Sequence, residues 1–426
     1  MSAVQVDSHV EVAAPPPPGF VRSLVGYGVI ALVAVVLALT APSGISKIQL
    51  TAGSEFFQIP QLDLPAALAV GVPAIGAAVI ATVALVTQLR SRSSAPRWMA
   101  ILAGTLLLLG FLAHLVAGKS GVLPLTGLLT STLFLATPLI FGALGGVVCE
   151  RVGIVNIAIE GQLLAGAFAG VVVASIAGQN PYVGLITAPI AGVGVGALLA
   201  WFSIRYRVDQ VITGVVLNVL VLGLTTFFFK GLLSELEGLN DRSRLPVLPI
   251  PLLSEIPVIG PVLFRQTLLV YLLYVIVILL HIYLFRSRWG LRVRSVGEHP
   301  KAADTVGIDV NRTRWRNTLL GSGIAGLGGA FFTIGQGLAF GIDITAGSGF
   351  IALAALILGR WTPLGAVAAA LFFGFANALS QSLRSYGVSL DSNIPLMIPY
   401  IVTLFAVAGF GGKVRPPAAE GTPYVK

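Results

Sequence analysis

The sequence predicts an all-α protein that crosses a membrane many times. Of its 426 residues, 56% are hydrophobic and only 10% are charged, and the mean hydropathy is +0.93. Soluble domains carry about 25% charged residues, so this chain lacks the polar side chains that a water-facing surface needs. Its long apolar runs at 29–39, 66–86 and 268–280 suit lipid, where one helical crossing takes about 20 residues. These observations exclude a cytosolic enzyme, a disulfide-rich secreted protein and a disordered chain.

Apolar segments separated by polar loops predict about 10–12 transmembrane helices. The segments are 21–41, 65–88, 98–117, 124–148, 153–177, 183–204, 210–230, 266–286, 316–338, 346–359, 363–384 and 394–411. The stretches 346–359 and 153–159 also have the features of broken or re-entrant helices. Glycine is abundant, with 50 residues, and glycine inside an apolar helix allows helices to pack closely in lipid.

The distribution of basic residues predicts how the chain is oriented. The loop 287–316 is rich in Arg and Lys, whereas acidic residues predominate in the loop 231–265. Because cytoplasmic loops carry the excess of Arg and Lys, we expect 287–316 inside and 231–265 outside. An even number of crossings then places both termini in the cytoplasm. The net charge of +9 follows from this topology and does not indicate a nucleic-acid partner.

The sequence also predicts how the chain is divided. We expect four parts, namely a disordered cytoplasmic tail at 1–20, additional transmembrane helices at 21–123, a core at 124–411 and a cytoplasmic C-terminal tail at 412–426. A single cysteine, Cys149, and four scattered histidines give no disulfide and no metal-ligand spacing. We also expect Glu150 and Arg151 to form an ion pair at the cytoplasmic edge of the membrane.

Two motifs resemble nucleotide-binding loops but fail on inspection. Residues 117–120 read Ala-Gly-Lys-Ser without the first glycine of a phosphate loop, and residues 321–326 match GxGxxG inside an apolar span. Neither follows a strand, which both folds require. We therefore interpret the glycines at 321–329 as helix-packing residues, and any ATP that the system uses is bound by another chain.

The loop 287–316 contains a signal for a short helix. Pro300 suits a first helical turn and Gly307 can end a helix in a left-handed cap, so we predict a helix over 300–306. A helix of two turns is not stable alone and must pack on something. Either a peripheral protein that moves the loop or the anionic membrane surface would serve, and composition leaves both interpretations open.

Three strings of residues resemble one family of transport proteins, the membrane permeases of ABC importers for branched-chain amino acids, ribose and nucleosides. The strings are Gly297-Glu298-His299-Pro300 with Ala302-Ala303 and Gly307-Ile308, then residues 150–162, and then 345–355 with 359–365. Their order and spacing agree over about 124–385. The subgroup that matches most closely imports nucleosides or related simple sugars, and residues 1–120 lie outside the match.

The resemblance implies an ABC importer permease fold with two related halves in a bacterial cell (inner) membrane. It also implies a second homologous permease subunit, a cytoplasmic ATP-binding subunit that holds ATP and Mg, and an extracytoplasmic substrate-binding (lipo)protein. No catalytic residue and no cofactor is expected in this chain. The residues that would couple it to the ATPase are Gly297, Glu298, Pro300, Ala302, Ala303, Asp304 and Gly307. A bulky charged residue at Ala303 is accordingly expected to abolish uptake.

Polar residues inside apolar spans are candidates for the substrate pathway. Asn156 and Glu160 are four residues apart, so on one helix they would share a face beside Gln162. That stripe either faces the pore or satisfies the ends of a neighbouring helix. Four further candidates for contact with a nucleoside or for interhelical bonding are Asn218, Gln336, Phe350 and Asn377.

An ion-coupled secondary transporter of small polar solutes is the main alternative. It would use Glu160 and Asp343 as ion sites, and it would need neither an ATPase nor the helix at 300–306. A membrane-embedded enzyme has little support, because no paired acids share a span and no histidines cluster.

Overall fold

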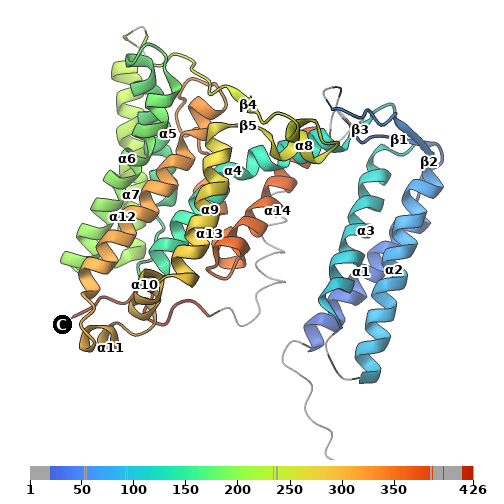
Figure 1. The fold of residues 1–426 in the computed structure, drawn as a ribbon, viewed down its shortest axis with the longest axis horizontal. Coiled ribbons are helices and arrows are strands. Elements are labelled where there is room, and N and C mark those ends of the chain that lie inside the picture. The colour runs from blue at the N-terminus through green and yellow to red at the C-terminus, as the bar shows by residue number, and fades with distance from the viewer. Residues whose placement is uncertain are drawn as a thin grey trace, which may run out of the picture. The chain divides into compact units, whose positions relative to one another are not determined.

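The computed structural model describes residues 20–383 except 52, 54, 92, 94, 234 and 237, together with 386, 397 and 415–425. The predicted crossing at 394–411, apart from residue 397, and the predicted tail at 1–20, apart from Phe20, lie outside the described residues. The chain divides into two compact units, and the main boundary falls between Leu123 and Pro124. Figure 1 shows both units, which are described separately below.

The smaller unit is a bundle of α1 (Phe20–Leu39), α2 (Ala66–Ser91) and α3 (Arg97–Val116). Between α1 and α2, strand β1 (Ile45–Gln49) pairs antiparallel with β2 (Leu62–Pro65), and β3 (Leu123–Pro124) lies at the boundary. The buried positions of α2 are mostly alanines at helical spacing, from Ala66 to Ala84. Small residues at this spacing let helix backbones approach closely, as lipid-embedded helices require.

The larger unit is almost entirely helical. Its elements are α4 (Leu125–Glu150), α5 (Ile159–Ile176), α6 (Pro181–Ala200), the π-helix η1 (Trp201–Arg205), α7 (Gln210–Phe228), the π-helix η2 (Phe229–Leu233), β4 (Val247–Pro249), the 3₁₀-helix η3 (Leu253–Glu255), α8 (Ile259–Leu263), β5 (Arg265–Thr267), α9 (Leu268–Arg286), α10 (Arg288–Glu298), α11 (Pro300–Thr305), α12 (Val310–Gly329), the π-helix η4 (Phe331–Gly335), α13 (Ser348–Leu358) and α14 (Pro363–Ser382). Strands β4 and β5 pair antiparallel between α7 and α9. The all-α expectation is confirmed, and these short strands are its only exceptions among the described residues.

Helix boundaries follow from capping residues in the sequence. The carboxylates of Asp209 and Asp309 accept backbone N–H groups at the starts of α7 and α12, and the Thr362 hydroxyl does the same at α14. Pro181, Pro300 and Pro363 occupy the first helical positions of α6, α11 and α14, where no N–H is needed.

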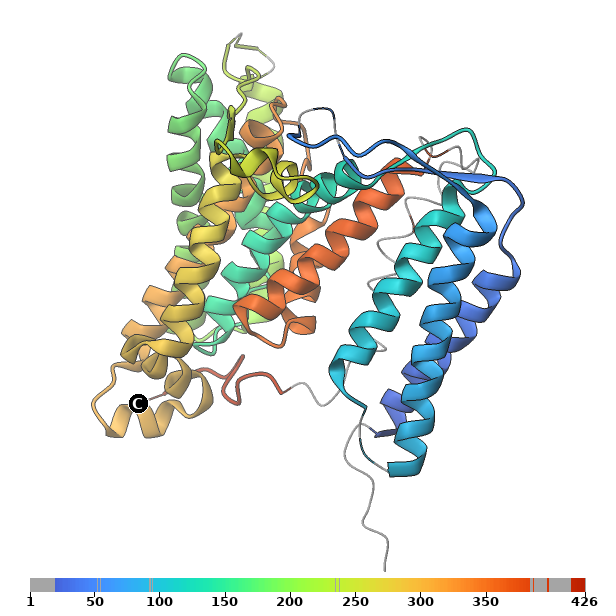
Figure 2. The ribbon, with the colours of Figure 1, turned by 45° about the vertical axis from the view of Figure 1, so that its right-hand side comes forward.

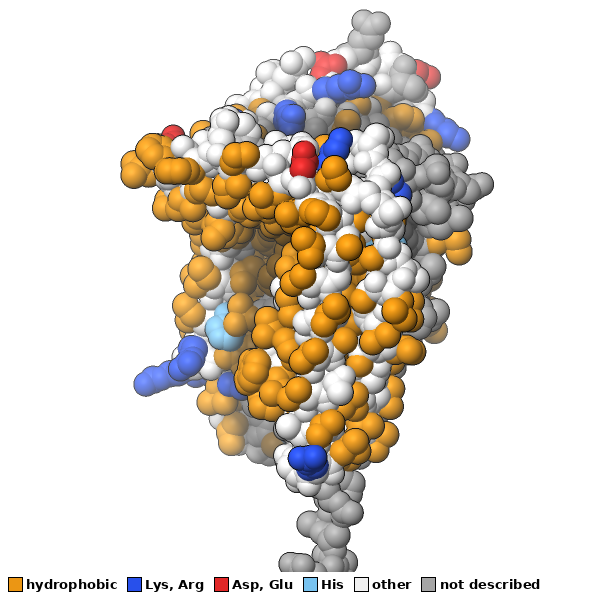
Figure 3. Space-filling model, turned by 90° about the vertical axis from the view of Figure 1, so that its right-hand side faces the viewer, with side chains coloured by type: hydrophobic (Ala, Val, Ile, Leu, Met, Phe, Trp, Pro, Cys, Tyr) orange, Lys and Arg blue, Asp and Glu red, His pale blue; other side chains and the backbone are white. Residues whose placement is uncertain are grey.

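Nine helices of the described residues are long and apolar enough to cross a membrane. Hydrophobic side chains cover much of the one face that Figure 3 shows. Helix α13 has 11 residues, so at a rise of about 1.5 Å per residue it spans only about half of the hydrocarbon layer. The segment 346–359 is therefore not a full crossing but a short helix. The segment predicted at 153–177 also changes, because residues 151–158 are non-helical and α5 begins at Ile159.

Helix α12 packs on α4, α5 and α6 through glycine. A Cβ atom at Gly321 would overlap the carbonyl oxygen of Gly145 on α4, and one at Gly166 on α5 would overlap that of Gly326. A Cβ at Gly192 on α6 would lie 2.6 Å from the Gly326 Cα. The backbones therefore touch, and the glycines at 321–329 pack helices, as the sequence predicted.

Replacing Gly192 by valine should lower the stability of the fold, because its side chain would push α6 away from α12. Overpacking a tight contact costs about 1–3 kcal/mol, and here the obstacle is backbone that cannot rotate away. The matched control is Gly194→Val on the same helix, where a Cβ meets nothing within 4 Å. Thermal unfolding of detergent-purified protein should show a lower Tm for Gly192→Val only. Equal Tm values for the two variants would contradict this account of the interface.

Candidate functional site

One end of the larger unit carries two short helices, α10 and α11. We call residues 287–309, which include both helices and the turn into α12, the elbow. Helix α9 ends at Arg286, α10 and α11 follow at once, and α12 returns into the unit (Figures 1 and 2). The Ser287 hydroxyl accepts the N–H of Gly290 at 3.0 Å, which starts α10 immediately after α9. A Cβ at Gly290 would overlap the Tyr283 carbonyl oxygen, so glycine permits this sharp turn.

The predicted short helix is confirmed as α11, with Pro300 at its first position. Gly307 follows it at φ +82°, in the left-handed region that favours glycine, and the Ile308 N–H donates to the Ala303 carbonyl at 3.0 Å. The chain then reaches Asp309, which caps α12. The elbow is thus built from strong local start and stop signals.

Ala303 and Val306 face opposite ways on this elbow. Ala303 is 3% exposed and packs into the protein, whereas Val306 is 75% exposed. Lys301, Ala302 and Thr305 are also exposed, and we call them with Val306 the outer face of α11. Because Ala303 is buried, a bulky charged residue there would act by disturbing the packing of α11, and the expected loss of uptake stays a prediction.

A C-terminal segment, residues 415–425, is bound against the elbow. The Ala419 N–H donates to the Gly297 carbonyl at 2.9 Å, and the Ala418 N–H donates to Glu298 Oε2 at 3.3 Å. The Tyr424 side chain is buried and hydrogen-bonds to Asp304. Three of the predicted coupling residues, Gly297, Glu298 and Asp304, therefore hold this segment.

The same segment is anchored to α12 by a buried arginine. Arg314 is 2% exposed, and its guanidinium donates to the carbonyl oxygens of Thr422 at 2.9 Å and Ala419 at 3.5 Å. Gly153 contributes room, because a Cβ there would lie 2.9 Å from Arg314 Nη2 and 3.1 Å from the Ala419 carbonyl oxygen. The segment is thus a tertiary part of the core.

Glu150 and Arg151 do not pair with each other as predicted. Glu150 accepts the Trp361 indole N–H at 2.5 Å and hydrogen-bonds to Glu420, whereas Arg151 Nε donates to the Trp361 carbonyl at 2.7 Å. Burial raises the pKa of the Glu420 carboxyl, although its hydrogen bond to Glu150 and the nearby Arg151 oppose that rise. Two carboxyl groups at hydrogen-bonding distance need a proton between them.

We expect attachment of the C-terminal segment to weaken as pH rises. A carboxyl whose pKa is raised in the folded state keeps its proton there. Its contribution to the free energy of attachment is therefore fully present below the unfolded pKa of about 4.5, and it is lost as pH rises through the folded pKa. Glu420→Gln supplies a permanent donor and should remove this dependence. Protection of the backbone amides of residues 418–424 from hydrogen exchange, measured at several pH values, reports how firmly the segment is attached. Protection that is independent of pH in the unsubstituted protein would contradict the shared proton.

Glu160 is in the first turn of α5, is 8% exposed, and directs its carboxylate to the start of α13. Its Oε1 accepts the Thr345 hydroxyl at 2.5 Å and the Gly347 N–H at 2.9 Å, and its Oε2 accepts the Gly349 N–H at 2.5 Å. The carboxylate therefore satisfies the exposed donors of a helix N-terminus. Of the two roles that the sequence left open for Glu160, the structure shows the hydrogen bonding of a neighbouring helix end.

Asn156 and Glu160 do not form a stripe on one helix face. Asn156 precedes α5, and its amide exchanges two hydrogen bonds with Gln162, at 3.0 and 3.1 Å. Gln162 also donates to the Ser322 hydroxyl on α12 at 3.0 Å. Both amide side chains are fully buried. The interpretation of a shared pore-facing stripe is therefore wrong.

Asn218 on α7 supports the non-helical backbone before α5. Its Oδ1 accepts the Gly161 N–H at 2.8 Å, and its Nδ2 donates to the Ile157 carbonyl at 2.9 Å. Gln210 on the same helix accepts the Val155 N–H at 2.6 Å. Irregular backbone inside a membrane protein needs such partners, because lipid supplies none.

The remaining pathway candidates do not gather at one place. Gln336 follows η4 and is half-buried, Phe350 is 51% exposed in the first turn of α13, and Asn377 is half-buried in α14. No hydrogen bond or ring contact joins any two of them within the described ranges. Asp343, the other proposed ion site, is exposed in a turn at φ +55°.

Sequence reasoning missed four residues that hold the elbow, namely Arg314, Trp361, Glu420 and Tyr424. Arg314 belongs to the basic stretch 287–316 in the sequence, but in the structure it is buried in the second turn of α12. The C-terminal residues Pro417, Ala419 and Tyr424 are buried at irregular spacing, so no helical or strand period marked them. The only sequence signal for this packing is that the predicted tail at 412–426 contains apolar residues such as Ala419 and Tyr424.

Nine candidate crossing helices, with glycine contacts between several of them, define a multi-pass membrane protein over the described residues. The chain belongs to the family described as branched-chain amino acid transport system / permease component, whose model matches residues 128–407. It is therefore a transport component and not an enzyme.

Several relatives are similar to this chain. A guanosine ABC transporter permease protein, NupQ, from Bacillus subtilis is 40% identical over 304 residues, which cover 70% of this chain and 95% of the relative. A nucleoside ABC transporter permease protein, NupC, from Lactococcus lactis is 37% identical over 70% of this chain and 96% of its own length. A putative glucose ABC transporter permease protein, TsgC13, from Haloferax volcanii is 34% identical over 63% and 82%. No solved structure matches.

Proposed function

We propose that this chain is a permease subunit of an ATP-driven importer that carries nucleosides, or related sugars, across the cell membrane. The observation that carries the proposal is the 40% identity across 95% of a guanosine permease. A glucose permease is also similar, at 34% identity, so the sugar class stays within the proposal.

The outer face of α11 is proposed to receive a cytoplasmic ATP-binding subunit. A compact, exposed helix that is braced by the C-terminal segment is suited to transmit a push into α4 and α12. In this proposal ATP and Mg stay on that subunit, and this chain binds no cofactor. A second homologous permease would complete the passage, and an extracytoplasmic binding (lipo)protein would deliver substrate.

The proposed orientation places the elbow, and with it both termini, in the cytoplasm of a bacterial cell. Arg and Lys concentrate at the elbow and support this side, by the positive-inside rule. Glu160 gives no support to ion-coupled transport, because both of its oxygens already accept hydrogen bonds from Thr345 and the start of α13.

Uptake of radiolabelled guanosine in a strain that lacks this chain tests the proposal. We expect the deletion to abolish high-affinity uptake, and expression of the chain to restore it, with unlabelled nucleosides competing better than glucose. Co-purification should recover an ATP-binding subunit and a second permease. Uptake that continues after ATP depletion, driven by a proton gradient, would overturn the ATP-driven mechanism.

A further inference from the structure

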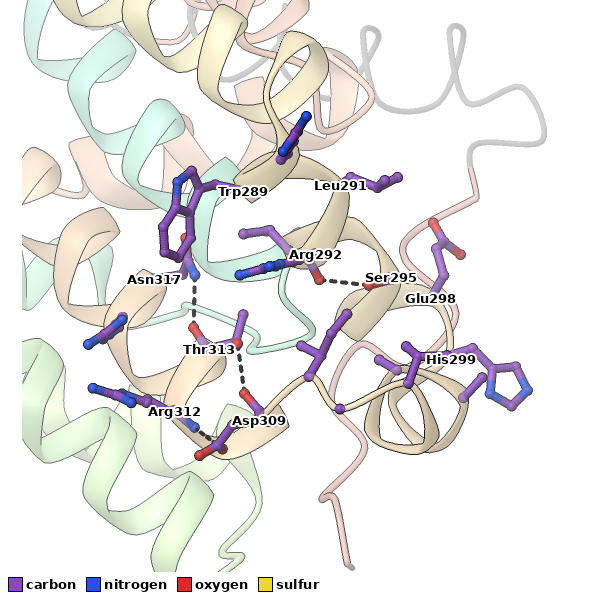
Figure 4. A pocket seen from close by; sticks show the side chains of 18 of the residues that line it. Trp289, Leu291, Arg292, Ser295, Glu298, His299, Asp309, Arg312, Thr313 and Asn317 are labelled. Carbon is purple, nitrogen blue, oxygen red and sulfur yellow. Dashed lines mark hydrogen bonds between the residues drawn. The ribbon is translucent and has the colours of Figure 1, made fainter.

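A large cavity opens between α10, α11 and α12. Its volume is about 1050 Å³, and Figure 4 shows side chains from all three helices around it. Arginines dominate its charge, with Arg288 and Arg292 from α10 and Arg312 and Arg316 from α12. Each pair is spaced four residues apart, so each pair lies on one side of its own helix.

The four guanidinium groups have no carboxylate partner among the described residues. The lining holds two acids against these four arginines. Asp309 Oδ1 accepts the backbone N–H of Arg312 at 2.9 Å, and Glu298 Oε2 accepts the backbone N–H of Ala418 at 3.3 Å. Arg292 lies over the Trp289 ring, 5.3 Å from its centroid. The cavity therefore holds an excess of positive charge that its own walls do not neutralise.

The cavity lies at the level where the helices leave the membrane. Tyr283 and Asn317, which also line it, belong to the membrane-spanning helices α9 and α12, and the Tyr283 hydroxyl donates to Asn317 Oδ1 at 3.0 Å. Trp289 is 58% exposed beside them. Trp315 contacts Trp201 with ring centroids 6.4 Å apart. Tryptophan and tyrosine side chains collect at the lipid headgroup level, so we take these residues to mark that level.

We propose that this cavity binds the phosphate headgroup of an anionic phospholipid. Guanidinium groups form paired hydrogen bonds with phosphate oxygens, and basic pockets between transmembrane helices suit anionic headgroups. The lipid tail has an apolar path, because Leu279 lies one helical turn from Tyr283 on α9 and is 58% exposed. Ala302 and Val306 of the outer face of α11 also line the cavity, so a protein partner on that face would lie at the rim of the cavity. The inference needs only that the chain spans a membrane and is independent of the proposed import function.

Lipid retention tests the inference directly. The whole complex, purified from native membrane, would be analysed by native mass spectrometry and then in nanodiscs that contain phosphatidylglycerol or only phosphatidylcholine. We expect bound phosphatidylglycerol or cardiolipin in the unsubstituted protein. Arg312→Gln with Arg316→Gln should reduce its retention about 30-fold. The matched control, Arg205→Gln with Arg286→Gln, removes two exposed arginines near the same ends of the helices but outside the cavity, and should retain the lipid.

Four results would overturn the inference. Two of them concern the variants: the control loses as much lipid as the Arg312/Arg316 variant, or the Arg312/Arg316 variant retains its lipid unchanged. The third is that the unsubstituted protein shows no preference for anionic lipid. The fourth is that the Arg312/Arg316 variant loses the ATP-binding subunit but keeps its lipid. Inorganic phosphate, added to complex in phosphatidylcholine nanodiscs, separates the two sources of phosphate. Saturable binding of phosphate together with no retained lipid would assign the cavity to a soluble anion instead. Because uptake is not the readout, failure here leaves the import proposal unaffected.

Discussion

A glutamate in place of Val306 should abolish uptake while the permease stays folded. Val306 is 75% exposed at the end of α11, so the change disturbs no packing within the chain. If the outer face of α11 docks on an ATP-binding subunit, the new carboxylate becomes buried without a partner. An unpaired buried charge at an interface costs about 2–5 kcal/mol, which weakens association about 30-fold or more. ATP-dependent uptake and co-purification of the subunit are the two measurements.

The matched control for this experiment is Val208→Glu. Val208 is 40% exposed in the turn between η1 and α7, and that turn lies at the same end of the helices as the elbow (Figure 1). It should transport normally. Ala303→Glu should instead lower the folded yield, because Ala303 is buried. Normal uptake by Val306→Glu would argue that the outer face of α11 does not dock.

The C-terminal segment gives the elbow a mechanical connection to the core. It is bonded to Gly297 and Glu298 on α10 and to Arg314 on α12, and Glu420 adds a bond to Glu150 on α4. A displacement of α11 would therefore move elements that run the length of the unit. Contacts of this kind transmit a small displacement of α11 to the helices bonded to the segment, because close-packed interiors deform little.

Local signals in the sequence were sufficient to predict most helices and the elbow. Pro300, Gly307 and Asp309 act on their immediate neighbours, so the start and end of α11 follow from residue type alone. The glycines of α12 were also interpretable, because glycine inside an apolar span has few other uses. The end of α13 was predictable, because Gly359 follows its last residue. The start of α14 was predictable from Pro363, its first residue.

Partners that are distant in sequence explain what was missed. Thr345 reaches Glu160 across 185 positions, and Ala419 reaches Gly297 through backbone groups that every residue carries. A buried carboxylate can line a pore, bind an ion or cap a helix, and only the fold decides among these. The stripe of Asn156 and Glu160 failed for a simpler reason, since the assumed helix starts after Asn156.

Replacing Glu160 by leucine should largely eliminate folded protein. The change leaves the Thr345 hydroxyl and the N–H groups of Gly347 and Gly349 without an acceptor in a water-free interior. Each unsatisfied buried donor costs about 1–3 kcal/mol, so the loss in the free energy of unfolding is about 3 kcal/mol or more. That is a large share of a typical stability of about 5–15 kcal/mol. Size-exclusion chromatography of the expressed protein and its Tm measure the loss.

Two milder variants separate the structural role of Glu160 from a role in ion coupling. Thr345→Val removes one donor of similar shape and should lower the free energy of unfolding by about 0.5–1.5 kcal/mol. Glu160→Gln keeps a carbonyl acceptor but has no charge, so it should fold with a reduced Tm and still take up substrate with ATP. An ion-coupled transporter requires the carboxylate itself. Folded Glu160→Gln protein with no uptake, beside normal uptake in Thr345→Val, would contradict the capping role and favour ion coupling.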